Sequence, residues 1–507
     1  MSRICQFVGF AFLAVVLPVT AADQRGLPGA AIREYCSDCH DSEMKKGGLD
    51  LESFLADPAS QHAAVWEKAV RKMQARQMPP IGKKRPDEAT YNSTVAQIAK
   101  LLDADAAKHP NPGRTETFRR LNRTEYQNAI RDLVGVEIDA TTFLPKDDAG
   151  HGFDNVTVGN LSPALLDRYI SAAEKISQLA VGTPREHVGG DTFRIKPDVT
   201  QEEHVEGLPI GTRGGGIFPY TFSESGEYEI QIRLMRDRNE EVEGLKEKHQ
   251  LELLLDRGHL QSFTVEPLKG PKAQEMADAH LKTRVQVPAG EHDLGVTFVK
   301  LPSSLLETKR QPYEAHFNVH RHPRITPAIY QVSITGPYKA AGPGDTESRR
   351  KIFIAKPTNA AEEDACAEKI LSNLMRRAYR RPVTKDDLEK PMAFFREARA
   401  QHGFDAGIEL GLSAILVNPN FLFHVEKDPE GIAANTPYKI SDINLASRLS
   451  FFVWSSIPDD ELLDTAIRGD LSKPKILEKE VRRMLADPRS KSLVNNFADQ
   501  WLYLRNL

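Results

Sequence analysis

The spacing of hydrophobic positions divides the chain into helical and extended regions. Near the N-terminus apolar residues recur every three to four positions, most clearly over 87–107, and this spacing predicts amphipathic helices. A second helix is predicted over 65–76 and a short helical segment over 32–35. From about residue 190 to 340 apolar residues alternate with polar ones, which predicts strands. Beyond residue 350 the helical spacing returns.

The alternating region contains five clear strands, bounded by turn residues. They cover 228–234, 251–255, 285–287, 294–298 and 329–335. The Pro-Ala-Gly turn at 288–290 favours a hairpin between the third and fourth of them. Short strands at regular intervals predict a β-sandwich, with a jelly-roll-like arrangement, over 185–345.

Length and composition exclude several classes of protein. With 507 residues the chain is long enough for three to four domains. A hydrophobic content of 40% and a charged content of 27% exclude collagen-like and wholly disordered chains. The net charge of −4 argues against nucleic-acid binding. Four cysteines are too few for a disulfide scaffold.

The N-terminus has the features of a secretory signal peptide over 1–21. Arg3 precedes an apolar run over 4–18, and Val19-Thr20-Ala21 follows as a small-residue cleavage site. No later apolar run approaches the ~20 residues needed to span a bilayer, so the mature chain is expected to have no transmembrane span. A periplasmic or extracellular location follows from this interpretation.

The strongest motif is Cys36-Ser37-Asp38-Cys39-His40, which matches the Cys-x-x-Cys-His pattern of c-type haem attachment. Two thiols at this spacing can each form a thioether to a vinyl group of the haem, and the adjacent imidazole can bind the iron. A redox dithiol, a structural disulfide and half of a zinc site are the alternatives. The sequence therefore predicts one covalent haem c, with His40 as the proximal iron ligand.

The candidate for the sixth iron ligand is Met78, in Gln77-Met78-Pro79-Pro80. A Met held between a helix and a rigid Pro-Pro segment can turn its sulfur toward the iron. Its rivals are Met73, Met44 and His62. With the helix over 87–107, residues 25–110 are predicted to form a small all-α, class I-like cytochrome c domain.

These residues resemble the planctomycete-type cytochrome c domain, which has the same Cys-x-x-Cys-His, a Lys-Gly-Gly-Leu segment as at 46–49, and Met-Pro-Pro. The rest of the chain is similar to the planctomycete-specific helical domains that accompany it. The motif at 121–126 resembles the first of these domains, the Arg-rich motif at 376–384 the second, and the segments 415–426 and 445–463 the third.

The resemblance implies a multidomain α+β architecture. The expected domains are a signal peptide over 1–21, the haem domain over 25–110, a helical domain over 114–184, a carbohydrate-binding-module-like sandwich over 185–345, and helical domains over 350–430 and 436–507. Proteins of this kind usually continue beyond the segment at 497–507 into a further cytochrome-like domain. We therefore expect either a truncated sequence or a one-haem version.

Three other features have both a functional and a structural interpretation. His316, His320 and His322, with Glu314, could form a metal site, but a solvated loop is favoured. Oxygen donors that could hold calcium are better interpreted as turn and capping residues; they are Asp147, Asp148, Asp154 and Asn155. Cys366 lies in a helical apolar pattern and is predicted to be a small buried residue.

A run of basic residues surrounds the predicted ligand Met78. It comprises Lys68, Arg71, Lys72, Arg76, Lys83, Lys84 and Arg85, with no acidic residue after Glu67. A solvated helix face is one interpretation. The other is a positive rim around the haem edge that attracts an acidic redox partner protein.

The predicted function is that of an exported c-type cytochrome that transfers single electrons. The alternatives are a glycan-binding scaffold, in which the sandwich binds polysaccharide and the haem domain is accessory, and a haem-linked oxidoreductase with its substrate site in the helical domains. Hydrolase motifs and a phosphate loop are absent, since Gly214-Gly215-Gly216 lacks the following Lys and Ser or Thr. Whether the chain is an enzyme stays open.

Overall fold

The computed structural model describes residues 26–109, 118–147, 153–154, 162–184, 188–269, 273–301, 324–433, 436–502 and 504. By their internal contacts the residues separate into two units. Unit 1 holds residues 1–115 with 433–438, and unit 2 holds 116–432 with 439–507. Each unit is described by itself. The predicted signal peptide and the histidines at 316–322 lie outside the described residues.

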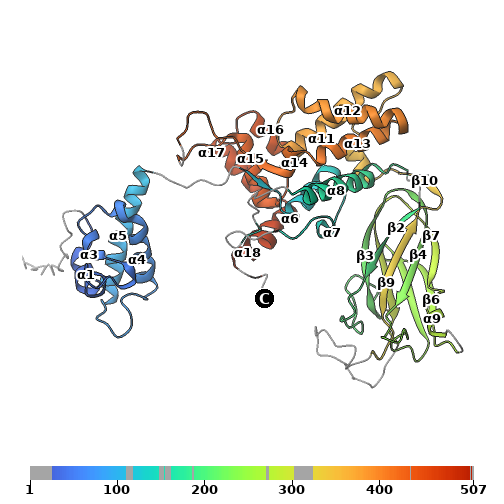
Figure 1. Ribbon diagram of the computed structural model, residues 1–507, viewed down its shortest axis with the longest axis horizontal. Coiled ribbons are helices and arrows are strands. Elements are labelled where there is room, and N and C mark those ends of the chain that lie inside the picture. Colours follow the sequence, from blue (N-terminus) through green and yellow to red (C-terminus); the bar gives the residue numbers. More distant parts are fainter. Residues whose placement is uncertain are drawn as a thin grey trace, which may run out of the picture. The chain divides into compact units, whose positions relative to one another are not determined.

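Unit 1 is all-helical (Figure 1). Its elements are α1 (Gly29–Tyr35), α2 (Ser37–His40), η1 (Lys46–Gly48), α3 (Leu51–Phe54), η2 (Ala59–His62), α4 (Ala63–Gln74) and α5 (Glu88–Lys108). The side chain of Asp87 caps α5 by accepting a hydrogen bond from the amide of Thr90 at 2.7 Å. The three helices expected here from sequence spacing are confirmed, with boundaries shifted by one to three residues.

The core of unit 1 forms where the apolar faces of these helices meet. Trp66 of α4 packs with Tyr91 and Ile98 of α5, and Ile32 of α1 joins them. Cys36 packs against the edge of this cluster. The first cysteine of the haem motif therefore lies at the border between the core and the surface.

The first part of unit 2 consists of helices from two distant regions of the sequence. The elements are β1 (Phe118–Arg120), α6 (Arg123–Val134), α7 (Ala140–Phe143), α8 (Pro163–Val181), α10 (Glu347–Ile352), η3 (Ala360–Glu362), α11 (Glu363–Tyr379), α12 (Lys385–His402), α13 (Phe404–Leu416), α14 (Pro419–Leu422) and β11 (Phe423–Val425). Residues before and after the sandwich share one hydrophobic core, as Tyr126 and Tyr169 do with Phe421. β1 also pairs antiparallel with β11, with Arg119 opposite His424.

A smaller core follows at the C-terminal end. It lies among α15 (Asp442–Trp454), α16 (Asp460–Ile467) and α17 (Pro474–Ala486), and is centred on Trp454 and Met484. The chain continues through η4 (Pro488–Ser490), the π-helical segment η5 (Leu493–Ala498) and α18 (Asp499–Trp501).

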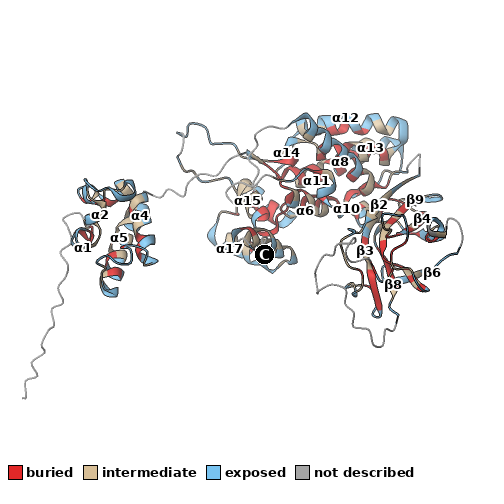
Figure 2. Cartoon of the chain, turned by 60° about the horizontal axis from the view of Figure 1, so that its bottom comes forward, coloured by how far each residue is buried: buried red, intermediate tan, exposed pale blue. Residues whose placement is uncertain are grey.

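The alternating region folds into two antiparallel sheets, which confirms the α+β class. One sheet contains β10, β4, β9 and β2 in that order, with β7 also paired to β4; the other has the order β3, β8, β5, β6. Their bounds are β2 (Gly189–Arg194), β3 (Thr212–Phe222), β4 (Ser225–Leu234), β5 (His249–Leu255), β6 (Gly258–Val265), β7 (Lys282–Val287), β8 (Gly290–Val299), β9 (Ile329–Gly336) and β10 (Ala340–Gly342), with the short helix α9 (Ala273–Met276) between β6 and β7. Figure 2 shows the buried residues along these strands in red.

The predicted hairpin between the strands at 285–287 and 294–298 is wrong. β7 pairs with β4, whereas β8 pairs with β3 and β5 in the other sheet. The turn between them therefore carries the chain from one sheet to the other, and the amide of Ala289 donates to the hydroxyl of Ser225 at 2.8 Å. Alternation reveals which residues of a strand face the core, but not which strand is its neighbour.

The glycine run at 214–216 has a structural role in the sandwich. The pairing of β3 with β8 shifts between Arg213 and Gly216, as at a β-bulge. Gly215 has φ +77°, and a Cβ there would lie 1.8 Å from the carbonyl oxygen of Val296. Only glycine fits this position, which explains the motif without a ligand.

Within the described parts of the chain, no helix has the length and apolar content needed to cross a bilayer. Among those same residues, no group of three or more His, Cys, Asp and Glu side chains is placed to hold a metal ion.

Candidate functional site

The haem motif spans the end of α1 and the short helix α2, because Cys36 caps α1 and residues 37–40 form α2. The amide of Cys36 donates to the carbonyl oxygen of Ile32 at 2.9 Å, which continues the bonding of α1. The carbonyl oxygen of Cys36 then accepts from the amides of Cys39 and His40, at 3.2 and 3.1 Å. Because Ile32 is buried in the core, its bond to the amide of Cys36 holds the start of the motif against that core.

Both cysteines are partly buried and neither is in a disulfide. Burial, together with the neighbouring Cys39, raises the pKa of the Cys36 thiol to about 11, so this thiol is protonated at neutral pH. Since no described cluster of ligands completes a zinc site around the pair, the zinc alternative gains no support.

His40 has an imidazole that no described residue engages. Its Nδ1 atom is buried and has no hydrogen-bond partner among the described residues. Immediately after it, the carboxylate of Asp41 accepts from the amides of Glu43 and Met44, at 3.1 and 2.6 Å, and turns the chain away. An imidazole that no described residue engages, beside two thiols, is the donor set that a covalently attached haem requires, so these residues fit the group.

Met78 lies in a loop that is held by backbone bonds. The amides of Gln77 and Met78 both donate to the carbonyl oxygen of Lys72, at 2.9 and 3.3 Å, and the ammonium group of Lys72 donates to the side chain of Gln77 at 2.7 Å. Arg76 has φ +55°, which ends α4 and reverses the chain direction. Met78 is 40% exposed, and the peptide bond to Pro79 is cis.

The other side of this loop is tied to the helix that leads into the haem motif. Lys84 forms an ion pair with Glu34 of α1 at 2.7 Å and lies 5.5 Å from the ring centre of Tyr35. Arg85 donates to the hydroxyl of Tyr91 at 3.0 Å and to the carbonyl oxygen of Arg76 at 2.8 Å. The loop that carries Met78 is thus anchored to α1, whose C-terminal cap is Cys36.

The three rival ligands have other environments. Met73 is 7% exposed and belongs to the core of unit 1. His62 is bound through Nε2 to the carboxylate of Asp57 at 2.8 Å, and its ring stacks on Phe54. Met44, at 53% exposure, has no core contacts.

The basic run near Met78 is partly neutralised by acidic side chains. Arg76 pairs with Glu88, Lys84 with Glu34, and Arg71 with Glu67. No described acidic residue pairs with Lys68 or Lys83. The positive charge around the loop is therefore smaller than the run of seven basic residues suggests.

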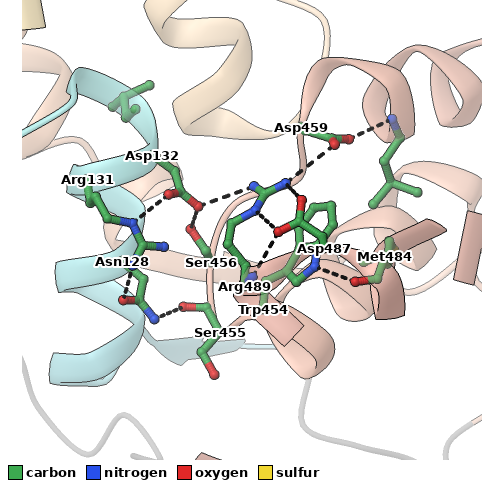
Figure 3. Close-up of polar contacts among 12 residues, drawn as sticks. Asn128, Arg131, Asp132, Trp454, Ser455, Ser456, Asp459, Met484, Asp487 and Arg489 are labelled. Carbon is green, nitrogen blue, oxygen red and sulfur yellow. Dashed lines mark hydrogen bonds and ion pairs between the residues drawn. The ribbon is translucent and has the colours of Figure 1, made fainter. Parts of the chain in front are cut away.

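A second polar centre lies in unit 2, where α6 meets the segments after α15 (Figure 3). The guanidinium of Arg489 donates to Asp487 at 2.7 Å and approaches Asp132 of α6 at 3.4 Å, and it lies 3.7 Å from the ring centre of Trp454. Asp132 also accepts from the hydroxyl of Ser456 at 2.6 Å. These groups satisfy one another, and they tie residues more than 300 positions apart.

Two open cavities adjoin this centre, with volumes of about 300 and 250 Å³. The larger is lined by Thr124, Asn128, Arg131, Pro488, Arg489, Lys491, Ser492, Asn495 and Asn496, and the smaller by Asp132, Lys351, Arg377, Ile457, Pro458, Asp459 and Arg489. The larger cavity lies between α6 and the segment 488–496, and the walls of the smaller one come from several separate parts of the chain, so neither follows from one contiguous motif.

The calcium interpretation gains no support from the described residues. The carboxylate of Asp147 pairs with Arg120 at 3.0 Å and accepts from the amide of Arg123 at 2.7 Å. Asp154 is described, whereas Asp148 and Asn155 lie outside the described residues.

The prediction for Cys366 is wrong, because its side chain is partly exposed. Ala367 occupies the fully buried position beside it, which a helical pattern alone does not distinguish.

Comparison with known families gives four matches, in the predicted order. Residues 36–82 match Planctomycete cytochrome C, and 119–182 match PSD3, a protein of unknown function (DUF1587). Residues 366–426 match PSD5 (DUF1595) and 440–507 match PSD4 (DUF1592), both also of unknown function. The resemblance to multidomain planctomycete cytochrome c proteins is confirmed. The segment 415–426, assigned above to the third helical domain, falls with 376–384 in the second.

The chain thus contains a cytochrome c domain of a type that carries covalently bound haem c. No curated protein matches the sequence. Among solved structures, a CBM35 from Cellvibrio japonicus Abf62 aligns with 30% of this chain and 97% of its own, at 12% identity and a TM-score of 0.17. A likeness that low carries no weight, so polysaccharide binding by the sandwich stays a prediction.

Proposed function

We propose that the chain is an exported c-type cytochrome that transfers single electrons through one covalently attached haem. The observation that carries this proposal is the turn at 36–40, which presents two thiols and an uncommitted imidazole at the border of a hydrophobic core. The family match over 36–82 begins at Cys36 and includes every proposed ligand. The predicted signal peptide supports a periplasmic or extracellular location.

Different residues of the haem domain would attach the haem, bind its iron and shield it from water. Cys36 and Cys39 would hold the haem through thioethers, and His40 and Met78 would bind its iron. When bound, the haem supplies the one-electron couple. The packed core around Trp66 and Ile98 would exclude water from one side of the cofactor, and a dry shell of this kind influences the redox potential.

Met78 is the best-supported sixth ligand because its loop is held by backbone bonds and an ion pair that do not use its sulfur. Backbone bonds to Lys72 fix the position of Met78, and the ion pair between Lys84 and Glu34 ties the loop to α1. Met73 is occupied in the core, and His62 is occupied by Asp57. A thioether opposite an imidazole raises the potential relative to two imidazoles.

The redox partner is proposed to be an acidic protein that meets the loop around Met78. Lys68 and Lys83 supply positive charge that no described acid neutralises. Because exposed charges interact over about 10 Å at 0.1 M salt, electron transfer to such a partner should slow as ionic strength rises. Whether the chain also catalyses a reaction on a substrate stays open.

The test is expression of the full chain with a c-type haem maturation system, followed by absorption spectra. The unmutated protein should contain one covalent haem per chain, measured by its pyridine adduct against protein concentration. Cys36→Ala should lose a thioether and shift the spectrum of that adduct, and His40→Ala should lose proximal ligation. Absence of covalent haem from the unmutated protein would falsify the proposal.

The sixth ligand is tested by Met78→Ala, with Met44→Ala as the matched control. The long-wavelength ferric band attributed to a bond between thioether sulfur and iron should disappear in the first variant and persist in the second. If the band survives in Met78→Ala, the ligand lies elsewhere, and Met73→Leu becomes the next variant to measure.

A further inference from the structure

A small cavity in unit 2 is lined by residues from three of the segments whose motifs carried the family resemblance, 376–384, 415–426 and 445–463. It has a volume of about 70 Å³ and is lined by Tyr379, Arg380, Arg381, Asn420, Phe423, His424, Val425, Glu426, Ile443, Asn444 and Ser447. Its walls come from the C-terminal end of α11, from α14 and β11, and from the first half of α15. This volume is sufficient for several water molecules or for a small planar anion.

Two polar groups in the wall of this cavity have no partner among the described residues. They are the hydroxyl of Tyr379 and the Nε2 atom of His424, and both atoms are sealed from bulk solvent. Leaving a buried polar group unsatisfied costs about 1 to 3 kcal/mol. Two such groups in the wall of one cavity indicate that the cavity holds a ligand that forms hydrogen bonds with both.

Among the described residues around the cavity, three arginines form an ion pair with a carboxylate and one does not. Arg119 pairs with Glu125 at 2.8 Å, Arg381 with Asp387 at 2.8 Å, and Arg448 with Glu426 at 2.6 Å. Arg380 differs from these three. Its guanidinium donates only to carbonyl oxygens, those of Ala378, Asn420, Phe421 and Phe423, at 2.7 to 3.3 Å.

The neutral state of His424 agrees with an excess of positive charge. Its ring packs edge-on against Phe451, with ring centres 4.3 Å apart. Burial first, and then the charges of Arg119, Arg380 and Arg448, lower the pKa of His424 well below its ordinary value. Burial and the neighbouring guanidinium groups thus both disfavour a further positive charge at His424.

We propose that this cavity binds a small, planar, monovalent oxyanion, such as formate, acetate or nitrate. The hydroxyl of Tyr379 and an Nε2–H group of His424 donate hydrogen bonds to its oxygens, while Arg380 supplies the compensating charge. One oxyanion satisfies both donors that have no described partner and compensates the charge of Arg380. The ligand is either an organic carboxylate or an inorganic anion, which share this chemistry.

The experiment measures thermal unfolding of the full chain at constant ionic strength and pH, while sodium chloride is replaced by sodium acetate, nitrate or sulfate. Acetate or nitrate should raise the unfolding temperature of unit 2 saturably, because a ligand that binds only the folded state stabilises it. A stronger effect of acetate assigns an organic carboxylate, and a stronger effect of nitrate assigns an inorganic anion. A non-saturating effect, or an equal effect of sulfate, would overturn the proposal.

Three variants separate anion binding from a purely structural role. Tyr379→Phe removes only a hydroxyl group without a described partner, so without the anion its stability should match or exceed that of the unmutated chain. Its affinity for the anion should nevertheless fall about tenfold, the effect of one hydrogen bond to a charged group. His424→Leu should lose affinity to a similar degree, whereas His424→Gln, whose amide can donate from the position of Nε2, should retain much of it.

The matched control is Tyr330→Phe in β9 of the sandwich, which should leave the anion affinity unchanged. Equal affinities in the unmutated chain, Tyr379→Phe and His424→Leu would overturn the assignment of these donors. None of these measurements requires haem, so failure here leaves the proposed electron transfer untouched.

Discussion

Replacement of Arg380 by Met should lower the stability of unit 2 by more than the same replacement of an exposed arginine. The guanidinium of Arg380 is buried, and it joins the end of α11 to α14 and β11 through bonds to carbonyl oxygens. Met has a similar length and an apolar end, so it fills the space without donating a bond. The substitution therefore leaves these carbonyl oxygens without their donor.

The expected loss follows from the lengths of the bonds. The two short bonds, to Asn420 and Phe423 at 2.7 Å each, are worth about 1.5 kcal/mol apiece as bonds from a charged donor. The longer bonds, to Ala378 and Phe421, add about 1 kcal/mol together. Part of this loss is offset because the variant no longer has to bury a charge. The free-energy cost of burying that charge is visible in the unmutated chain, where burial lowers the pKa of Arg380 to about 10. We therefore expect a net loss of about 2 to 4 kcal/mol.

The assay is guanidinium chloride unfolding of the full chain, followed by far-UV circular dichroism. Arg396→Met serves as the matched control, because the guanidinium of Arg396 forms a single exposed ion pair with Asp364 at 2.8 Å. That change should cost less than about 1 kcal/mol. If the midpoint falls no further in Arg380→Met than in Arg396→Met, the carbonyl bonds do not stabilise the fold as described.

Three further predictions concern other parts of unit 2. Gly215→Ala should destabilise the sandwich by more than about 2 kcal/mol, because the new Cβ meets the carbonyl oxygen of Val296. Gly431→Ala is the control, because Gly431 has a similar φ with nothing within 4 Å of the new Cβ, and this change should cost only about 1 kcal/mol. Equal midpoints of the two variants in thermal unfolding would contradict the clash. His424 binds a proton less readily in the folded than in the unfolded chain, where its pKa has the ordinary value of histidine, about 6.5. The free energy of unfolding should therefore fall as pH drops below about 6.5, by up to about 1.4 kcal/mol per pH unit. Denaturant midpoints at pH 7.5 and 5.5 measure this slope, and His424→Gln should remove the part of it that comes from His424. Asp132→Asn and Arg489→Met should show a coupling energy of about 1 kcal/mol in a double-mutant cycle of unfolding, and strict additivity would mean that their contact at 3.4 Å contributes nothing.

Much of the local structure could be predicted from the sequence because short-range spacing determines it. The helix at 87–107 and the strand at 228–234 each have a periodic apolar face, and both form within a few residues of the predicted limits. The prediction of a hairpin at 285–298 was wrong because the same turn sequence can join strands of one sheet or of two. Which strands pair depends on how the two sheets pack, and this is not visible in the turn sequence.

The candidate site shows the same division. Cys36, Cys39 and His40 are adjacent in the chain, so one turn brings them together and the motif can be identified from sequence. The cavity bounded by Tyr379 and His424 could not be predicted, because these residues are 45 positions apart and neither forms a motif with a known chemistry. The polar centre at Arg489 depends on Asp132, more than 350 positions earlier.

The sequence by itself determined the cofactor chemistry, the helical and extended regions and the order of the family segments, since each depends on residues close together in the chain. Only the tertiary structure decided that helices before and after the sandwich share one core, that Met73 lies in the core of unit 1 while His62 pairs with Asp57, and that Arg380 forms no ion pair with an acidic residue in the described parts of the chain. These outcomes depend on which distant surfaces exclude water against each other, and a hydrophobic or charged residue type does not specify the surface it will meet.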